Sequence, residues 1–210
     1  MSKTAHEIKH IVFDVGRVLI HWDPEIPFLH LIPDEVERQH FLANICSPKW
    51  NLEQDRGRSW ADAEDILIKQ HPDKKLQIRG FRKHWIEMIY GALDDSVVIM
   101  KHLVDQGMDV TLLTNFNQET FPLAKEKFPF LKLPRGETVS GEIGLIKPDL
   151  EIYQHHTKTH GLDPQACLFF DDSQKNVDGA RATGWQAELF TSPAQMRADL
   201  EKHGVAQVAR

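Results

Sequence analysis

Carboxylate, hydroxyl and ammonium side chains stand in four short segments spread along the 210-residue chain. Asp14 could attack phosphorus as a nucleophile, and the adjacent pair Asp171 and Asp172 offers the hard oxygen ligands that Mg²⁺ prefers. Lys147 could neutralise negative charge that develops in the transition state of such a reaction. The segments are Phe13-Asp14-Val15-Gly16, Leu113-Thr114-Asn115, Ile146-Lys147-Pro148-Asp149 and Phe169-Phe170-Asp171-Asp172-Ser173.

Thr114 and Asn115 complete this set, because their side chains could form hydrogen bonds to phosphoryl oxygens. Each residue alone is weak evidence, since a single Asp or Lys at a strand end is commonly a turn residue. The four segments together, in this order, predict a site that could attack a phosphoryl group, hold it by hydrogen bonds and bind a metal ion beside it.

Three of the four segments follow apolar runs, at 11–13, 110–113 and 167–170, which predict buried strands. The carboxyl ends of parallel strands meet at one edge of a sheet, where the polar residues after each run would converge. From residue 95 onward, helical patterns at 95–106, 149–160 and 174–183 alternate with the strands, and a further strand is predicted at 186–190. This alternation predicts an α/β fold with a Rossmann-like parallel sheet.

Between the first strand and the rest, the chain shows helical spacing only, at 34–45, 59–70 and 74–90. We therefore expect an inserted α-helical cap at residues 22–95 and a catalytic core formed by 1–21 and 96–210. The cap carries Trp50, Trp60, Phe81 and Trp85, for which packing among the cap helices is the default expectation.

Composition narrows the classes of partner. A net charge of −6 and a sequence with 41% hydrophobic residues predict a globular protein without the basic face that nucleic acid or an anionic membrane would favour. Residues 1–7 are polar and lack the apolar stretch of a secretion signal, and no run has membrane-spanning length. Two cysteines, Cys46 and Cys167, make a disulfide framework improbable. We expect a cytoplasmic protein with a small-molecule substrate; the sequence does not indicate its oligomeric state.

At the four segments the chain resembles the haloacid dehalogenase-like (HAD) hydrolase superfamily, whose motifs match Asp14, Thr114, Lys147 and the pair Asp171-Asp172 in order. The resemblance covers essentially the whole chain. It implies an Asp14 nucleophile, a phosphorylated small-molecule substrate, and Mg²⁺ bound by Asp14, the Gly16 carbonyl region, Asp171 and Asp172.

The helical insert resembles the C1-type cap of that superfamily. Residues 50–57 look like its specificity loop, and they make Asp55 and Arg56 candidates for substrate binding. Residues 13–19 resemble more narrowly the branch that includes sugar-1-phosphate phosphatases and the phosphatase domains of epoxide-hydrolase-like proteins. The resemblance therefore implies a phosphatase, with sugar phosphates among its substrates.

Gly16 departs from the superfamily pattern, in which most phosphatases carry a second Asp that serves as general acid and then as general base. Such acid–base help is typically worth about a hundredfold or more in rate. The candidates to replace it are His21, Asp23 and the cap residue Asp55, or else a substrate whose leaving oxygen needs little protonation.

Two other functions are open. A 2-haloacid dehalogenase would use the same nucleophile without metal, but an acidic pair without a metal would repel the charge of Asp14. A regulatory protein that has lost activity is the alternative suggested by Gly16. Twelve histidines also invite a metal site, yet His155 and His156 are adjacent, and we expect both to be solvated helix residues.

Overall fold

A five-stranded parallel sheet forms the centre of the core. The computed structural model describes residues 7–205; residues 1–6 and 206–210, at the two ends of the expected core, lie outside the described part. The strand order is β3-β2-β1-β4-β5, so β1 lies in the middle, between β2 and β4. The strands are β1 (His10–Phe13), β2 (Asp109–Thr114), β3 (Gly136–Val139), β4 (Cys167–Asp171) and β5 (Gln186–Leu189).

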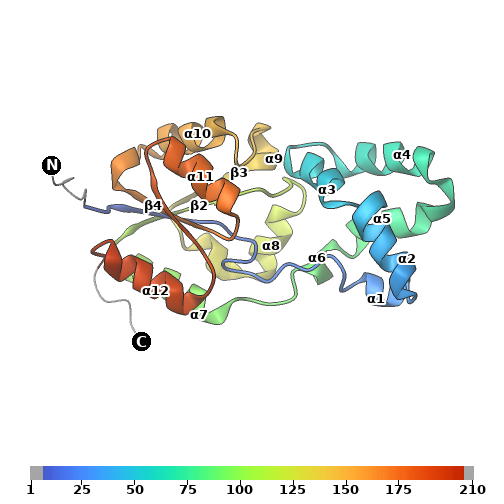
Figure 1. Cartoon of the computed structure of the whole chain (residues 1–210), viewed down its shortest axis with the longest axis horizontal. Coiled ribbons are helices and arrows are strands. Elements are labelled where there is room, and N and C mark those ends of the chain that lie inside the picture. The colour runs from blue at the N-terminus through green and yellow to red at the C-terminus, as the bar shows by residue number, and fades with distance from the viewer. Residues whose placement is uncertain (1–6, 206–210) are drawn as a thin grey trace.

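Helices cover both faces of this sheet (Figure 1). Side chains of a strand alternate between faces, and in β1 Ile11 and Phe13 pack in one apolar cluster while Val12 packs in the other. The first cluster includes residues of α7 (Asp94–Asp105), α8 (Phe121–Lys127) and α12 (Pro193–Lys202). The second includes residues of α10 (Leu150–His160) and α11 (Gln174–Ala182). The core is therefore a three-layer α/β structure, as the sequence predicts.

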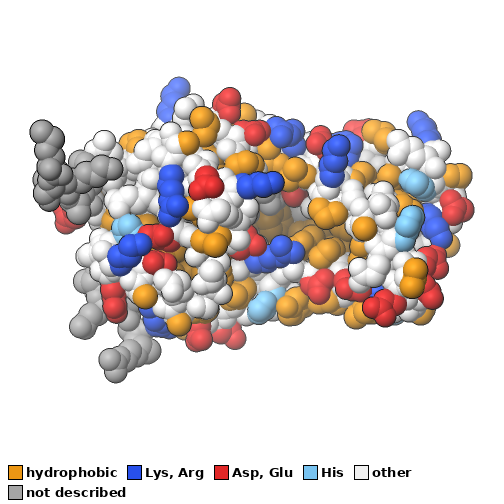
Figure 2. Space-filling model, in the orientation of Figure 1, with side chains coloured by type: hydrophobic (Ala, Val, Ile, Leu, Met, Phe, Trp, Pro, Cys, Tyr) orange, Lys and Arg blue, Asp and Glu red, His pale blue; other side chains and the backbone are white. Residues whose placement is uncertain are grey.

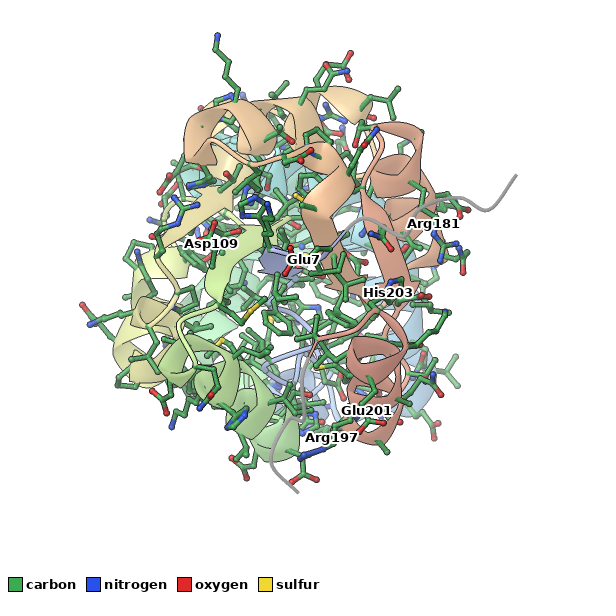
Figure 3. The ribbon with its side chains drawn as sticks, turned by 90° about the vertical axis from the view of Figure 1, so that its left-hand side faces the viewer. Glu7, Asp109, Arg181, Arg197, Glu201 and His203 are labelled. Carbon is green, nitrogen blue, oxygen red and sulfur yellow. The ribbon has the colours of Figure 1, made fainter. Side chains whose placement is uncertain are left out.

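The strands begin at the end of the molecule where Glu7 and His203 lie (Figures 1 and 3). Asp109, the first residue of β2, lies there and accepts hydrogen bonds from Arg135 and His10. These hydrogen bonds, with that from Arg135 first, lower the pKa of Asp109 despite its partial burial. The carboxyl ends of the strands therefore face the other way, toward the helical lobe.

The helical lobe is built from short elements. They are α1 (Phe28–Leu31), α2 (Glu35–His40), a π-helical segment (Phe41–Ile45), α3 (Pro48–Asp55), α4 (Trp60–Gln70), α5 (Lys75–Lys83) and α6 (Trp85–Met88). Trp50, Trp60 and Phe81 form an aromatic cluster in its interior, with ring centroids 5.3 to 5.8 Å apart. Packing among the cap helices is thus the role of Trp50 and Trp60, as expected. We propose that the cap spans residues 22–95 and the core the remainder.

Several elements differ from the prediction. β3 was not expected, because only Val139 among its four residues is a bulky apolar residue. The predicted helix 34–45 continues beyond α2 as the π-helical segment, and 74–90 divides into a 3₁₀ turn (Pro72–Lys74), α5 and α6. Helices α3, α8, α9 (Ser140–Ile143) and α12, and the 3₁₀ turns Pro129–Lys132 and Pro164–Ala166, were also not predicted.

His156 corrects a second expectation. It is not solvated but fully buried in α10, where its ring nitrogens contact the hydroxyls of Thr111 at 2.9 Å and Thr138 at 2.8 Å. This histidine therefore ties α10 to β2 and β3. None of the helices between residues 7 and 205 is long and apolar enough to cross a membrane.

Candidate active site

The four segments meet at the carboxyl edge of the sheet. Asp14 directly follows β1, and Asp171 is the last residue of the neighbouring strand β4. Strand order reverses at β1, which is the place where open parallel sheets bind ligands. The Nζ atom of Lys147 lies 2.9 Å from Oδ1 of Asp14 and 2.7 Å from Oδ2 of Asp171. The edge therefore holds a buried cation between two carboxylates.

Lys147 is held in place through its backbone as well as its side chain. Asn115 donates from Nδ2 to the carbonyl of Lys147 at 2.9 Å and accepts at Oδ1 from the Lys147 backbone N–H at 2.8 Å. The Lys147 ammonium also donates to the carbonyl of Leu113 at 3.0 Å. Both amide atoms of Asn115 thus serve to position Lys147, whereas sequence reasoning assigned Asn115 to a phosphoryl contact; that contact stays a prediction.

The two carboxylate oxygens of Asp14 differ in their hydrogen bonds. Oδ1 accepts from the backbone N–H of Val15 at 2.7 Å in addition to Lys147. Oδ2 has no hydrogen bond from any residue in the described part of the chain. Two donors thus fix the carboxylate and leave one oxygen for attack.

Asp171 and Asp172 differ in their surroundings. Asp171 is fully buried and accepts at Oδ1 from the Ser173 N–H and from Nδ2 of Asn176, each at 2.9 Å. Asp172 lines the cavity described below, and its Oδ2 lies 3.8 Å from Arg17. Asp172 is therefore the carboxylate that is open toward a ligand.

The carboxylates fit a divalent cation. Asp14, Asp171 and Asp172 each place a carboxylate oxygen within 4.8 Å of the others. Burial raises the pKa of Asp14, opposed by the charge of Lys147 and increased further by Asp171. Burial, followed by the charge of Asp171, also raises the pKa of Asp172. Negative charge is in excess here, and hard oxygen ligands in this number suit Mg²⁺.

Lys147 remains an ammonium group in this setting. Burial lowers its pKa, but the charges and hydrogen bonds of Asp14 and Asp171 outweigh that effect, and the pKa is raised. Thr114 lies at the end of β2 and is buried. Gly16 borders the cavity, and a Cβ at this position would meet nothing within 4 Å. The space that the missing aspartate side chain would occupy is therefore open.

The cap reaches this edge through residues 54–58. Asn117 donates from Nδ2 to the carbonyl of Gln54 at 2.9 Å, Gln118 donates to the carbonyl of Gly57 at 3.3 Å, and the Ser140 hydroxyl donates to the carbonyl of Asp55. Gly57 has φ of +108°, and a Cβ there would lie 2.9 Å from the carbonyl oxygen of Gly141. The segment is thus clamped to the core with no room for a side chain at Gly57.

This clamp directs Asp55 into the cavity. Its Oδ2 accepts from Nδ2 of Asn51 at 3.2 Å. Burial, and then the charge of Asp14, raises the pKa of Asp55 to about 8, so at neutral pH the carboxyl carries a proton. Arg56 lies elsewhere: it pairs with Asp149 at 3.3 Å and does not line the cavity, so its role in substrate binding stays a prediction.

A cavity of about 350 Å³ lies between core and cap, and Figure 2 shows the hollow there. Its polar end is formed by Gly16, Arg17, Asn51, Asp55, Asn115 and Asp172. The remaining side chains that line it are apolar, and they include Phe81 and Trp85, for which packing among the cap helices alone was expected. Sequence reasoning missed Arg17, which has φ of +59°, and the clamp residues Asn117, Gln118 and Ser140, whose contacts depend on the fold.

Known proteins share this architecture. A HAD-like hydrolase from Porphyromonas gingivalis matches with a TM-score of 0.74 at 21% identity, covering 96% of this chain and 100% of that one. A HAD enzyme from Bacteroides thetaiotaomicron, solved with magnesium and inorganic phosphate, matches with a TM-score of 0.69 at 22% identity over 88% of this chain and 95% of its own. No family model matches the chain.

A sesquiterpene phosphatase of Aspergillus oryzae is 33% identical over 178 residues, which is 84% of this chain and 86% of that protein. The chain belongs to the HAD hydrolase family. It is an enzyme of that family with a phosphatase among its relatives. A 2-haloacid dehalogenase from Xanthobacter autotrophicus also matches, with a TM-score of 0.65 at 15% identity over 95% of this chain and 85% of that one, and so shares the HAD fold.

Proposed function

We propose that this HAD hydrolase cleaves small phosphomonoesters in a Mg²⁺-dependent reaction through an aspartyl-phosphate on Asp14. The observation that carries the proposal is the Lys147 ammonium between Asp14 and Asp171, at 2.9 and 2.7 Å, with Asp172 open to the cavity beside them. The acidic pair favours attack on phosphorus over attack on a haloacid carbon, because without a metal it would repel the charge of Asp14, whereas the buried lysine suits both reactions.

In the first step Oδ2 of Asp14 attacks phosphorus while the bond from phosphorus to the alcohol oxygen breaks. Lys147 neutralises charge on the transferred group, and Thr114 lies at the adjacent strand end to hold a phosphoryl oxygen. Mg²⁺, held by Asp14, the Gly16 carbonyl and Asp172 beside Asp171, would supply further charge neutralisation. In the second step water attacks the phosphorus and releases Asp14 and phosphate.

Asp55 supplies the proton transfer that Gly16 cannot. Its proton passes to the alcohol oxygen in the first step, and its carboxylate then takes a proton from the attacking water. The clamp at residues 54–58 and the protonated state of Asp55 at neutral pH support this role. The other candidates do not line the cavity: Asp23 accepts from the Glu25 N–H at 2.9 Å, and His21 stacks on Tyr90.

Phosphate release from 4-nitrophenyl phosphate tests the reaction. Turnover by the wild type should require Mg²⁺, and Asp14→Asn should reduce it by about a thousandfold or more, because the amide is not a nucleophile. Asp23→Asn is the matched control and should keep most of the activity. Turnover that survives either chelation or Asp14→Asn would contradict the proposal, and halide release from 2-haloacids would then be measured.

Two substrate classes are open to this chemistry. The sequence resemblance favours sugar phosphates, whereas the name of the A. oryzae relative points to terpene-derived substrates. In the proposed reaction the residues at the strand ends would contact the phosphoryl group that both classes share, so they do not distinguish the two. Cytoplasmic location stays a prediction.

A further inference from the structure

The cavity continues beyond the phosphoryl end as an apolar chamber. We define the apolar chamber by Ile20, Trp22, Leu42, Trp85, Ile89 and Phe116, which come from the loop after β1, from the cap and from the loop after β2. Trp85 lies between Trp22 and Phe116, with ring centroids 5.5 and 5.2 Å away. Figure 2 shows hydrophobic side chains gathered at the hollow between the two lobes.

The polar side chains that line the cavity belong to its phosphoryl end and not to the apolar chamber. Asn115 uses both amide atoms on Lys147, and Asp172 lies against Arg17. Asn51 donates to Asp55, and its Oδ1 is the one buried side-chain atom of the lining without a hydrogen-bond partner in the described residues. The side chains of the apolar chamber itself offer a substrate only the indole N–H groups of Trp22 and Trp85 as hydrogen-bonding groups.

This inventory argues against a sugar. A sugar phosphate would bring several hydroxyl groups into the chamber, and each hydroxyl buried there without a partner would weaken binding. Hydrocarbon in the same place would instead gain from leaving water. The volume of about 350 Å³ is at the small end of the range for ligand pockets, which fits one modest organic group.

We propose that the substrate is the phosphate monoester of an apolar alcohol, whose hydrocarbon part fills the apolar chamber while the phosphate lies at Asp14. The inference rests on the proposed function for its orientation, phosphate at the sheet edge and hydrocarbon toward the cap. The cavity that contains the chamber is also lined by Gly16, Asn115 and Asp172, which lie at the ends of β1, β2 and β4, so there is room for both parts of such an ester.

Binding of n-alkylphosphonates tests the chamber without turnover, because their phosphorus–carbon bond is not cleaved by this chemistry. In calorimetry with Mg²⁺, affinity should rise about fourfold for each added methylene from ethyl to hexyl, as expected for burial of about 0.8 kcal/mol per methylene. An affinity that does not change with chain length would overturn the inference.

Turnover of a matched ester pair gives a second readout. Cyclohexylmethyl phosphate and glucose 6-phosphate both release a primary alcohol attached to a six-membered ring, and they differ mainly in hydroxyl groups. We expect kcat/KM to be at least about a hundredfold higher for the apolar ester, since burying unpaired hydroxyls is costly. Equal or better hydrolysis of glucose 6-phosphate would overturn the inference and leave the phosphatase proposal standing.

The two proposals can fail separately. If no ester is hydrolysed but alkylphosphonate affinity rises with chain length, the chamber assignment holds and the proposed reaction fails. Leu42→Trp should fill part of the chamber and abolish the gain beyond short chains, because Leu42 lines it and is only partly buried. Leu52→Trp, on an exposed cap residue outside the lining, is the control and should keep the gain. A full chain-length gain in Leu42→Trp would place the hydrocarbon elsewhere.

Discussion

The core edge and the cap contribute to the site in different ways. At the core edge, Lys147 contacts two carboxylates and a carbonyl, and Asp171 accepts from Lys147, Ser173 and Asn176. Outside this cluster, five described side chains each have a buried polar atom with no hydrogen-bond partner: Trp50, Asn51 and Trp60 of the cap, and Ser96 and Gln118 of the core. Buried polar groups normally have hydrogen-bond partners, so the difference between the cluster around Lys147 and these side chains is informative.

The core edge and the cap therefore have different tasks in the site. The hydrogen bonds and ion pairs around Lys147 hold these charges in one geometry, which is what phosphoryl transfer requires of its catalytic groups. The cap supplies apolar surface and one acid, Asp55, and the core itself holds that acid through Asn117 and Ser140. Precise chemistry therefore resides in the core, and the shape of the substrate pocket resides largely in the cap.

The largest effect is expected when Lys147 is removed from the core edge. In Lys147→Met, Asp14 and Asp171 lose their shared cation, and unfolding free energy at pH 8 without Mg²⁺ should fall by about 3 kcal/mol. The deficit should shrink as pH falls, since burial raises the pKa of Asp14 and a protonated carboxyl needs no cation. Activity should drop by about 10²–10³-fold.

Urea denaturation across pH measures this loss. Lys69→Met removes an exposed cap lysine and should change stability by less than about 0.5 kcal/mol. A Lys147→Met protein as stable as the wild type at pH 8 would show that the carboxylates at the core edge do not depend on this cation.

Asp55→Asn tests whether the cap contributes chemistry as well as shape. The amide keeps the size of the side chain but cannot transfer a proton, so kcat/KM for an alkyl phosphate should fall about a hundredfold. The loss on 4-nitrophenyl phosphate should be only a few-fold, because that leaving group needs little protonation. The pKa of Asp55 is raised to about 8, so wild-type activity on the alkyl ester should decline above pH 8, and the variant should lack this decline.

Asp23→Asn is the matched control for Asp55→Asn, and it should leave both esters and the pH profile unchanged. Equal losses on both esters in Asp55→Asn would mean that Asp55 positions the cap and transfers no proton. All of the chemistry would then lie at the sheet edge, and the cap would contribute only shape.

The division between core edge and cap also explains which parts of the fold and the site could be predicted from the sequence. Asp14, Lys147 and the pair Asp171-Asp172 stand beside strands whose apolar runs are visible locally, and parallel strands bring their carboxyl ends together. The edge strand β3 escaped because its residues 136–138 are Gly, Glu and Thr. The clamp on residues 54–58 was not predicted because it joins the cap to the loop after β2 and to the start of α9, and no local pattern records such contacts.

His156 tests a second set of buried hydrogen bonds in the core, whose expected effect on stability is smaller. Burial lowers its pKa well below the ordinary value, followed by the charges of His160 and His155. Below about pH 6.5 the unfolded chain binds a proton that the folded state does not, so stability is present above that pH and falls as pH decreases, by up to about 1.4 kcal/mol per pH unit.

His156→Gln should remove most of this pH dependence, because glutamine does not titrate. Denaturation midpoints at pH 7.5 and 5.5 should therefore lie closer together in His156→Gln than in the wild type. His40→Gln, on an exposed histidine, should preserve the wild-type separation. An unchanged separation in His156→Gln would assign the acid sensitivity to other groups, such as His160, whose pKa is also lowered by burial.

Arg56→Ala should have the smallest effect, and it examines the boundary between the two regions. Arg56 of the cap pairs with Asp149 of the core, but their side chains are 42% and 47% exposed, and such pairs contribute little. Stability should change by less than about 0.5 kcal/mol, KM for phosphate esters should stay the same, and Asp149→Ala should behave alike. A roughly tenfold rise in KM in Arg56→Ala alone would instead mean that Arg56 leaves Asp149 to bind substrate. The cap would then supply a charged contact in addition to its apolar surface and Asp55.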